Sequence, residues 1–240
     1  MTYLQFHLLF NLPVTLVLYF LTRGSWTGAE GIAVAEVLAA VMVFTSPWDN
    51  WAVQKGIWDF PPTRTLGRIG YLPWEEYLFF IWQSVNVIGL VAWLLRAFPG
   101  LQSHLGTPVG PGNGLAALGL LAVWIWIGKA IRGRKPSPRW NYARHLLYWF
   151  LPVIAVQWAV APRLFLALLP VLGIATLFWG TYYVIADLIA VRAGIWYFDP
   201  AQITGVKLAS ILPWEEIAFF YLTSLLVAQS YLLLAPAAVR

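Results

Sequence analysis

Two adjacent carboxylates occur twice in this chain, in identical surroundings. The string Leu-Pro-Trp-Glu-Glu runs from Leu72 to Glu76 and again from Leu212 to Glu216. The candidate catalytic residues are Glu75, Glu76, Glu215 and Glu216. Carboxylates are costly near lipid, so acids inside or at the edge of a membrane indicate a functional site. One acid that keeps its proton can donate it while a second accepts, which is general acid–base catalysis.

Aromatic residues accompany the acids. The chain has 15 Trp, 11 Tyr and 14 Phe, and Phe-Phe follows each acid pair. Glu75 shares a helix face with Phe79, and Glu76 with Phe80. Adjacent acids point about 100° apart, so at most one of each pair faces the interior directly. Acids and aromatics in an apolar cavity suit carbocation chemistry, because aromatic faces stabilise cations and dry surroundings protect them.

An ordinary structural role is also open for these acids. Pro73 and Pro213 fit the first turn of a helix, and the following glutamates then lie where the helix dipole favours negative charge. The duplication favours the functional interpretation, since both copies are followed by the same aromatic pair.

Composition predicts an integral membrane protein. Of 240 residues, 60% are hydrophobic and 10% are charged, and mean hydropathy is +0.71; soluble domains carry about 25% charged residues. The absence of Cys excludes thiol catalysis and iron–sulfur clusters. The absence of Gly-x-Gly-x-x-Gly excludes a Rossmann flavin domain. The three His lack metal-ligand spacing, and the net charge of +5 is scattered, so we expect neither a metal nor a nucleic-acid partner.

Apolar stretches of about 20 residues predict an all-α fold with about seven transmembrane helices. The stretches cover roughly 3–22, 31–48, 72–96, 114–131, 142–161, 163–187 and 212–234. Pro13, Pro152 and Pro170 fall inside spans and are expected to kink them.

Seven spans fix which loops share a side of the membrane. One side collects Lys55, Arg64, Arg68, Lys129, Arg132, Arg134, Lys135, Arg139, Arg144, Arg192 and Lys207, and the other collects Arg23, Arg96, Arg163 and Arg240. This bias predicts insertion in the cell membrane with the N-terminus in the cytoplasm.

The repeat extends beyond the acids. Asp-x-x-Ala-Val-x-x-Gly-Ile-Trp-x-Phe runs from Asp49 to Phe60 and from Asp187 to Phe198. Spans one to three therefore correspond to spans five to seven, and the fourth span is a linker. An odd linker span makes the repeats parallel and places both acid pairs at one depth. The predicted division is a first repeat at 1–97, a linker span and basic loop at 98–141, and a second repeat at 142–240.

Further residues are candidates to bind substrate or support the acids: Asp49, Asp187, Trp58, Trp196, Trp74, Trp214, Phe79, Phe80, Phe219 and Phe220. Asp49 and Asp187 are expected to end spans two and six, where capping or a salt bridge is the alternative role. Trp58 and Trp196 also suit interfacial anchors. Glu36 lies inside span two with no assigned role.

The doubled Pro-x-Glu-Glu-x-x-Phe-Phe, preceded by Asp…Gly-Ile-Trp-x-Phe, resembles the integral-membrane lycopene cyclases. These occur as two small subunits or one fused chain in bacteria and archaea, and in fungi a related domain is fused to phytoene synthase. The resemblance covers roughly 1–96 and 142–234 and implies the fused form. Trp74 and Trp214 stand at the variable position of the motif, where an aliphatic residue is common.

The resemblance implies that acyclic ends of lycopene, or of another linear carotenoid, are closed to β-ionone rings without net redox change and without a cofactor. A proton-coupled transporter and another prenyl-lipid enzyme, such as a hydratase, stay open as alternatives. A retinal photoreceptor is excluded because the span 212–234 contains no Lys. The ring type, the number of ends cyclised and the oligomeric state stay open.

Overall fold

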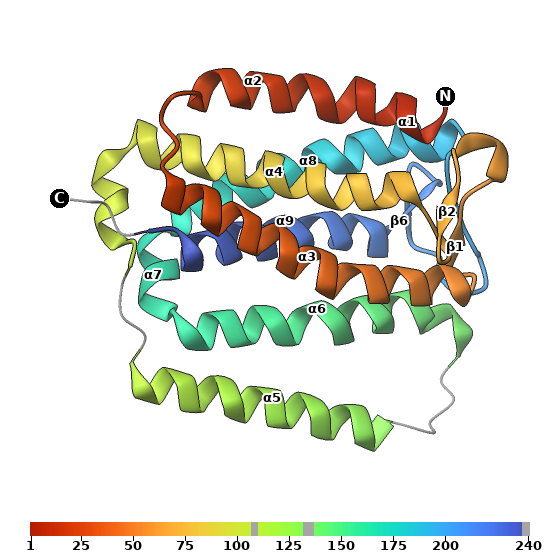
Figure 1. The fold of residues 1–240 in the computed structure, drawn as a ribbon. Coiled ribbons are helices and arrows are strands. Elements are labelled where there is room, and N and C mark those ends of the chain that lie inside the picture. Colours follow the sequence, from red (N-terminus) through yellow and green to blue (C-terminus); the bar gives the residue numbers. More distant parts are fainter. Residues whose placement is uncertain (107–109, 132–136, 237–240) are drawn as a thin grey trace.

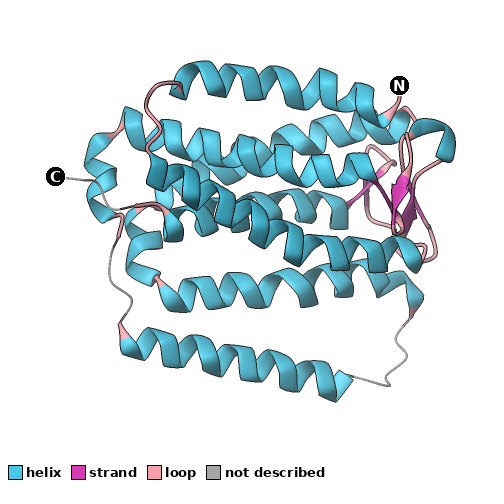
Figure 2. Ribbon diagram, viewed as in Figure 1, coloured by secondary structure: helices cyan, strands magenta, loops and turns pink. Residues whose placement is uncertain are grey.

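The computed structural model describes residues 1–106, 110–131 and 137–236, and these form a bundle of long helices. Figure 1 shows the helices lying side by side, with the N-terminus at one end of the bundle. Figure 2 shows the strands confined to that same end, here called the strand end. The expected all-α membrane fold is confirmed.

The helices are α1 (Tyr3–Phe6), the π-helical turn η1 (His7–Asn11), α2 (Leu12–Thr22), α3 (Gly28–Gln54), η2 (Pro62–Arg64), α4 (Trp74–Ala97), η3 (Pro99–His104), α5 (Pro111–Ile131), η4 (Pro138–Trp140), α6 (Asn141–Val160), α7 (Pro162–Ala167), α8 (Leu169–Arg192) and α9 (Trp214–Leu234). The strands are β1 (Trp58–Asp59), β2 (Arg68–Ile69), β3 (Leu72–Pro73), β4 (Tyr197–Phe198), β5 (Lys207–Leu208) and β6 (Leu212–Pro213). β2 pairs with β3, β5 with β6 and β1 with β4, all antiparallel.

Six segments of the described chain are long and apolar enough to cross a membrane: Tyr3–Thr22, Gly28–Gln54, Trp74–Ala97, Gly112–Ala130, Leu169–Arg192 and Trp214–Leu234. The remaining expected span, the fifth at 142–161, forms α6, a helix of 20 residues packed between α5 and α9. Arg144 and His145 lower its apolarity near its start. Of the seven expected spans, six are therefore apolar enough to cross a membrane, and α6 is a less apolar helix of the same bundle.

The segment expected to be one span at 163–187 is two helices. The chain turns at Leu168, between α7 and α8. Pro170 lies in the first turn of α8, where its missing N–H costs no helical hydrogen bond. The expected kink at Pro170 is therefore wrong, whereas Pro152 does lie within α6. Pro13 lies in the first turn of α2, directly after the π-helical turn.

The two halves meet at the strand end. β1 pairs with β4 so that Trp58 lies opposite Phe198 and Asp59 opposite Tyr197. Trp58 and Trp196 are equivalent in the repeat, so Asp59 is paired with its own equivalent. A two-fold axis relating the two repeats, and passing between β1 and β4, would produce this pairing. The division at 1–97, 98–141 and 142–240 stays a prediction. α4 and α9 pack against each other, and α5 packs mainly on α6 at the periphery (Figure 1).

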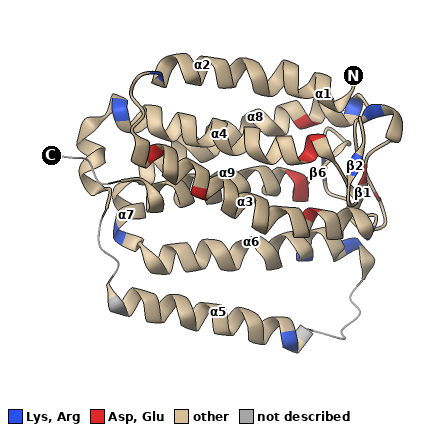
Figure 3. Cartoon of the chain, in the orientation of Figure 1, with Lys and Arg blue, Asp and Glu red and all other residues tan. Residues whose placement is uncertain are grey.

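Charge is distributed unevenly along the bundle. Figure 3 shows most acidic and many basic positions near the strand end. Of the basic residues used to predict orientation, Arg132, Arg134, Lys135 and Arg240 lie outside the described residues.

Candidate active site

The Asp…Gly-Ile-Trp motif folds back on itself at the end of α3. Gly56 adopts a φ of +66°, which favours glycine and ends the helix. The next amide, Ile57 N–H, then donates to the carbonyl of Ala52 at 3.0 Å. This reversal brings Trp58 alongside α3, and its Nε1 donates to Asp49 Oδ1 at 3.0 Å.

The second copy repeats this geometry at the end of α8. Gly194 has a φ of +68°, and Trp196 Nε1 donates to Asp187 Oδ1 at 2.7 Å. The indole N–H partly replaces the hydration that each carboxylate loses. Asp49 and Asp187 therefore lie inside α3 and α8, and the expectation that they end their helices or cap them is wrong. Both tryptophans are buried, so they are not interfacial anchors.

The Leu-Pro-Trp-Glu-Glu copies each join a strand to a helix. Pro73 (φ −55°) and Pro213 (φ −57°) precede the first helical residue, so α4 and α9 begin two residues after the expected starts at 72 and 212. The first acid of each pair holds a loop: Glu75 Oε1 accepts from Leu66 N–H, and Glu215 Oε1 accepts from Thr204 N–H, both at 2.8 Å.

The second acid of each pair faces a shared cavity. Tyr3 Oη donates to Glu76 Oε2 at 2.6 Å, and Tyr142 Oη donates to Glu216 Oε2. Both glutamates are buried. Adjacent residues on a helix point about 100° apart, so the first acid of each pair contacts a loop and the second faces the cavity.

The cavity has a volume of about 40 Å³ and is built from both halves. It is lined by Tyr3, Trp48, Asp49, Trp58, Phe60, Glu76, Phe79, Tyr142, Trp196, Phe198, Glu216, Phe219 and Phe220. Each half also supplies an indole to the other half's tyrosine. Trp58 packs on Tyr142 with ring centroids 4.9 Å apart, and Trp196 packs on Tyr3 at 5.1 Å.

The two aspartates differ in their surroundings. Asp49 lines the cavity and lies within hydrogen-bonding reach of Glu76. A hydrogen bond between two carboxyl groups needs a proton on one of them. Asp187 is covered by Trp196, and its Oδ2 has no hydrogen-bond partner among the described residues.

The structure gathers most of the predicted site residues and separates a few. Phe80 lines a neighbouring, larger cavity. Trp74 and Trp214 pack toward their own loops: Trp214 Nε1 donates to Thr204 Oγ1 at 2.6 Å, and Trp74 lies beside Gly67. They do not belong to the described lining of the acidic cavity. Glu36 is exposed on α3, away from this lining.

Sequence reasoning missed Tyr3, Tyr142 and Trp48. A signal for the tyrosines was present, because Tyr3 precedes Pro13 by the same spacing as Tyr142 precedes Pro152. His7 was also missed; its Nε2 lies 2.9 Å from the carbonyl oxygen of Glu75 and its ring stacks on Tyr3.

Within the described ranges, no group of three or more His, Asp or Glu is placed to hold a metal ion. The site therefore consists of two glutamates, one aspartate and two tyrosines inside an aromatic wall. This arrangement can give a proton to an apolar ligand and take one back.

Comparison with known proteins adds to this geometry. The chain is 32% identical over 226 residues to "Lycopene beta-cyclase" of Halobacterium salinarum, covering 93% of this chain and 91% of that protein. It is 28% identical over 229 residues to "Bifunctional lycopene cyclase/phytoene synthase" of Phycomyces blakesleeanus, covering 92% of this chain and 37% of that protein. The protein of the same name from Blakeslea trispora is 28% identical over 231 residues, covering 92% and 37%. No protein-family model and no solved structure matches the chain.

Proposed function

Since the chain belongs to the lycopene beta-cyclase family, we propose that it closes the acyclic ends of lycopene, or of a related linear carotenoid, to β-rings by acid–base catalysis. The observation that carries this proposal is the placement of Glu76 and Glu216, one from each half, on a single aromatic cavity. Family membership makes the chain an enzyme of carotenoid biosynthesis, and its apolar helices make it a membrane protein.

The proposed reaction is an isomerisation. A carboxyl group gives its proton to the terminal double bond of the substrate, and a tertiary cation forms. The electron pair of the inner double bond attacks this cation and closes a six-membered ring. A carboxylate then removes a proton from a ring carbon, and the new double bond forms. One proton enters and one leaves, so the atoms balance and no redox cofactor is required.

The two halves are suited to different steps. Asp49 and Glu76 approach each other closely enough to share a proton, so we assign this pair as the donor. Glu216 faces the same cavity from the other half and bonds to Tyr142 rather than to a second carboxyl group, so we assign it as the base. Glu75 and Glu215 bond to loop amides and serve to position their neighbours.

The aromatic wall suits the cation between these steps. Trp58 and Trp196 lie on opposite halves of the cavity, and Phe219 and Phe220 complete its apolar side. Aromatic faces attract a cation within about 6 Å, and a site without bulk water prevents its capture as an alcohol.

We also propose that the strand end faces the cytoplasm, with the two repeats inserted in parallel. The basic residues Lys55, Arg68, Arg144, Arg192 and Lys207 lie at or near that end of their helices and strands, which supports this orientation. Both acidic motifs would then lie at the cytoplasmic edge of the cell membrane.

Expression in bacteria that accumulate lycopene tests the proposed function. We expect extracted pigments to contain carotenoids with β-rings, identified by chromatography and mass spectrometry. Unchanged lycopene in membranes that contain the protein would overturn the assignment. The alternative of a proton-coupled transporter predicts that outcome, since transport leaves the pigment unaltered.

A further inference from the structure

A second cavity lies directly beside the acidic one. It has a volume of about 260 Å³ and is formed by α3, α4, α6 and α9. Its few polar groups are largely paired with one another. Gln83 Nε2 donates to Thr223 Oγ1 at 2.8 Å, and Gln157 Nε2 donates to Ser230 Oγ at 2.9 Å. A cavity with such walls suits an apolar ligand.

The two cavities share one side chain. Phe219 lines both. It stacks on Trp48 with ring centroids 5.4 Å apart and meets Phe150 edge-on at 6.0 Å. A change in the Phe219 rotamer would therefore join the larger cavity to the space in front of Glu216.

Volume decides which cavity can hold the reacting end. A cavity of about 150 Å³ holds one benzene ring. The acidic cavity, at about 40 Å³, is too small for a six-membered ring, whereas the larger cavity at about 260 Å³ is large enough. The end of the substrate must therefore occupy the larger cavity and reach the acids past Phe219.

The larger cavity also extends to the outside of the bundle. Its inner wall includes the buried Thr45, and its outer wall includes the exposed Ala40. α3 and α6 touch from the strand end to their middles, where His145 Nε2 lies 3.0 Å from the carbonyl oxygen of Trp48 and Trp149 Nε1 donates to the carbonyl of Phe44. Beyond this contact α3 slopes away from α6 (Figure 1). An extended chain could leave the cavity here and continue into lipid.

The corresponding region of the other half is filled. Counting back from the repeated aspartates pairs Ala40 with Phe178, Val41 with Trp179 and Thr45 with Tyr183. Every replacement is larger. Tyr183 is also fixed, because its hydroxyl donates to Asn11 Oδ1 and accepts from Asn86 Nδ2, both at 3.0 Å.

We propose that the cavity between α3, α4, α6 and α9 binds the end of the carotenoid together with the first part of its conjugated chain. Ala40, Val41 and Thr45 leave this cavity open because their side chains are small. This inference rests on the proposed function for the identity of the ligand. Because the described residues form this cavity in one half and carry larger side chains at the equivalent positions of the other, one carotenoid end is processed in each binding event. A product with two rings then requires release and rebinding.

Filling the cavity tests the proposal in the full-length protein. Val41→Trp introduces the residue that fills the other half, and Ala40→Phe blocks the exposed mouth, where a larger side chain has room. Val43→Trp is the matched control, since Val43 lies on the same helix and is 77% exposed. Two quantities are measured for each variant in lycopene-producing bacteria: the cyclised pigment per amount of protein, and the lycopene that co-purifies when Glu76→Gln and Glu216→Gln are also present.

We expect Val41→Trp and Ala40→Phe to lower both quantities at least about tenfold, and Val43→Trp to leave them within twofold. If Val41→Trp does not accumulate in membranes, Ala40→Phe decides the question. Normal cyclisation and normal lycopene retention in the filled variants would overturn the proposal. If the unmodified protein leaves lycopene acyclic while filling still abolishes lycopene retention, the binding cavity stands and the proposed reaction fails.

Discussion

The two halves of the molecule carry the same acids, but the side chains beside those acids differ in size. Tyr3 with Glu76 in one half matches Tyr142 with Glu216 in the other, and each aspartate accepts a hydrogen bond from an indole nine residues later. On the cavity side, however, α3 carries Ala40 and Val41 where α8 carries Phe178 and Trp179. Under the proposed function, a duplicated acid–base set would therefore serve a single substrate cavity.

The difference also extends to the acids themselves. Asp49 approaches Glu76, whereas Asp187 Oδ2 has no partner among the described residues. A cyclisation needs one group that gives a proton and another that takes it. Two identical halves would not distinguish these roles, so the asymmetry is what the proposed reaction requires.

The largest expected effect comes from the two glutamates at the cavity. Glu76→Gln and Glu216→Gln should each lower cyclisation at least about a hundredfold, because each removes one partner of general acid–base catalysis. Glu75→Gln and Glu215→Gln are matched controls, since an amide oxygen still accepts the loop N–H. The measurement is pigment conversion in membranes with known amounts of protein. Equal losses at all four positions would contradict the division of roles.

A smaller effect should separate the two aspartates. Asp49→Asn and Asp187→Asn both keep an oxygen for the indole N–H of Trp58 or Trp196. Only Asp49→Asn removes a carboxyl group that can share a proton with Glu76. We expect cyclisation to fall at least about tenfold for Asp49→Asn and only a few-fold for Asp187→Asn. The reverse order would move the proton donor to the second half.

The tyrosines should show a further, smaller asymmetry. Tyr142→Phe removes the hydroxyl that stabilises Glu216 as a carboxylate, so we expect about a tenfold loss of cyclisation. Tyr3→Phe removes the same contact from Glu76, which keeps Asp49 as a partner, so we expect a smaller loss. Kinetics with both variants in detergent or vesicles would measure the difference. A larger loss for Tyr3→Phe would assign the base to Glu76.

The sequence alone predicted the helices better than their ends. Apolar stretches identify spans because lipid requires them. Five spans were found where expected, and a sixth, expected at 163–187, runs from Leu169 to Arg192 instead. The sequence places Asp49 at the end of a span, whereas α3 continues to Gln54. Trp58, which lies after α3, donates an indole hydrogen bond to Asp49. The pattern of apolar residues within α3 does not predict a contact with a residue outside the helix. The two-residue strands were missed because they are too short to show alternation.

The acids of the site could be predicted, and the shape of the site could not. Identical copies of Leu-Pro-Trp-Glu-Glu mark Glu76 and Glu216 whatever their partners are. The tyrosines lie in segments where the copies have diverged, so only their spacing to a proline was shared. The one-sided cavity depends on how Val41 and Trp179 fill space between packed helices, which only the three-dimensional arrangement reveals.

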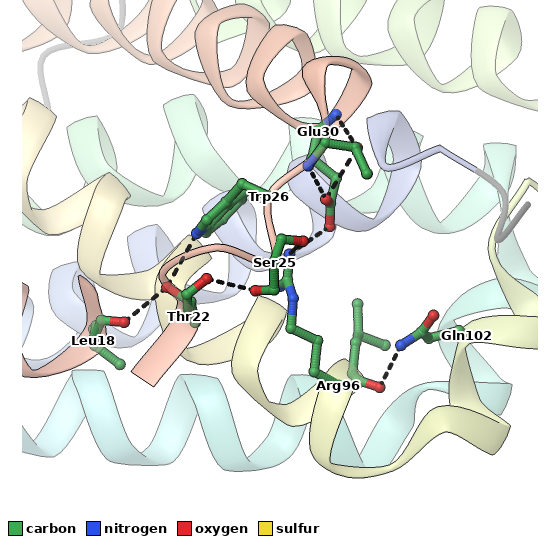
Figure 4. A network of polar contacts seen from close by, with 9 residues as sticks. Leu18, Thr22, Ser25, Trp26, Glu30, Arg96 and Gln102 are labelled. Atoms are coloured by element: carbon green, nitrogen blue, oxygen red, sulfur yellow. Dashed lines mark hydrogen bonds and ion pairs between the residues drawn. The ribbon is translucent and has the colours of Figure 1, made fainter. Parts of the chain in front are cut away.

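The smallest expected effect concerns a polar network of the first half, far from the acids. Figure 4 shows Arg96 between Glu30 and Ser25, and Arg96 pairs with Glu30 at 2.8 Å and lies over the Trp26 ring at 4.8 Å. α9 ends without such a pair among the described residues, since Pro236 stands at the position equivalent to Arg96. Arg96→Met should lower the thermal midpoint by about 2–4 °C, because a partly exposed ion pair contributes up to about 1 kcal/mol.

Cyclisation by the Arg96→Met protein should be unchanged below that midpoint. The exposed Arg163, in α7 at the same end of the bundle, provides the control, and Arg163→Met should change neither quantity. Thermal unfolding of purified protein, followed by tryptophan fluorescence, measures the midpoint. A loss of cyclisation without a loss of stability would mean that this end of the first half acts on the acids, and the halves would then differ in coupling as well as in cavity shape.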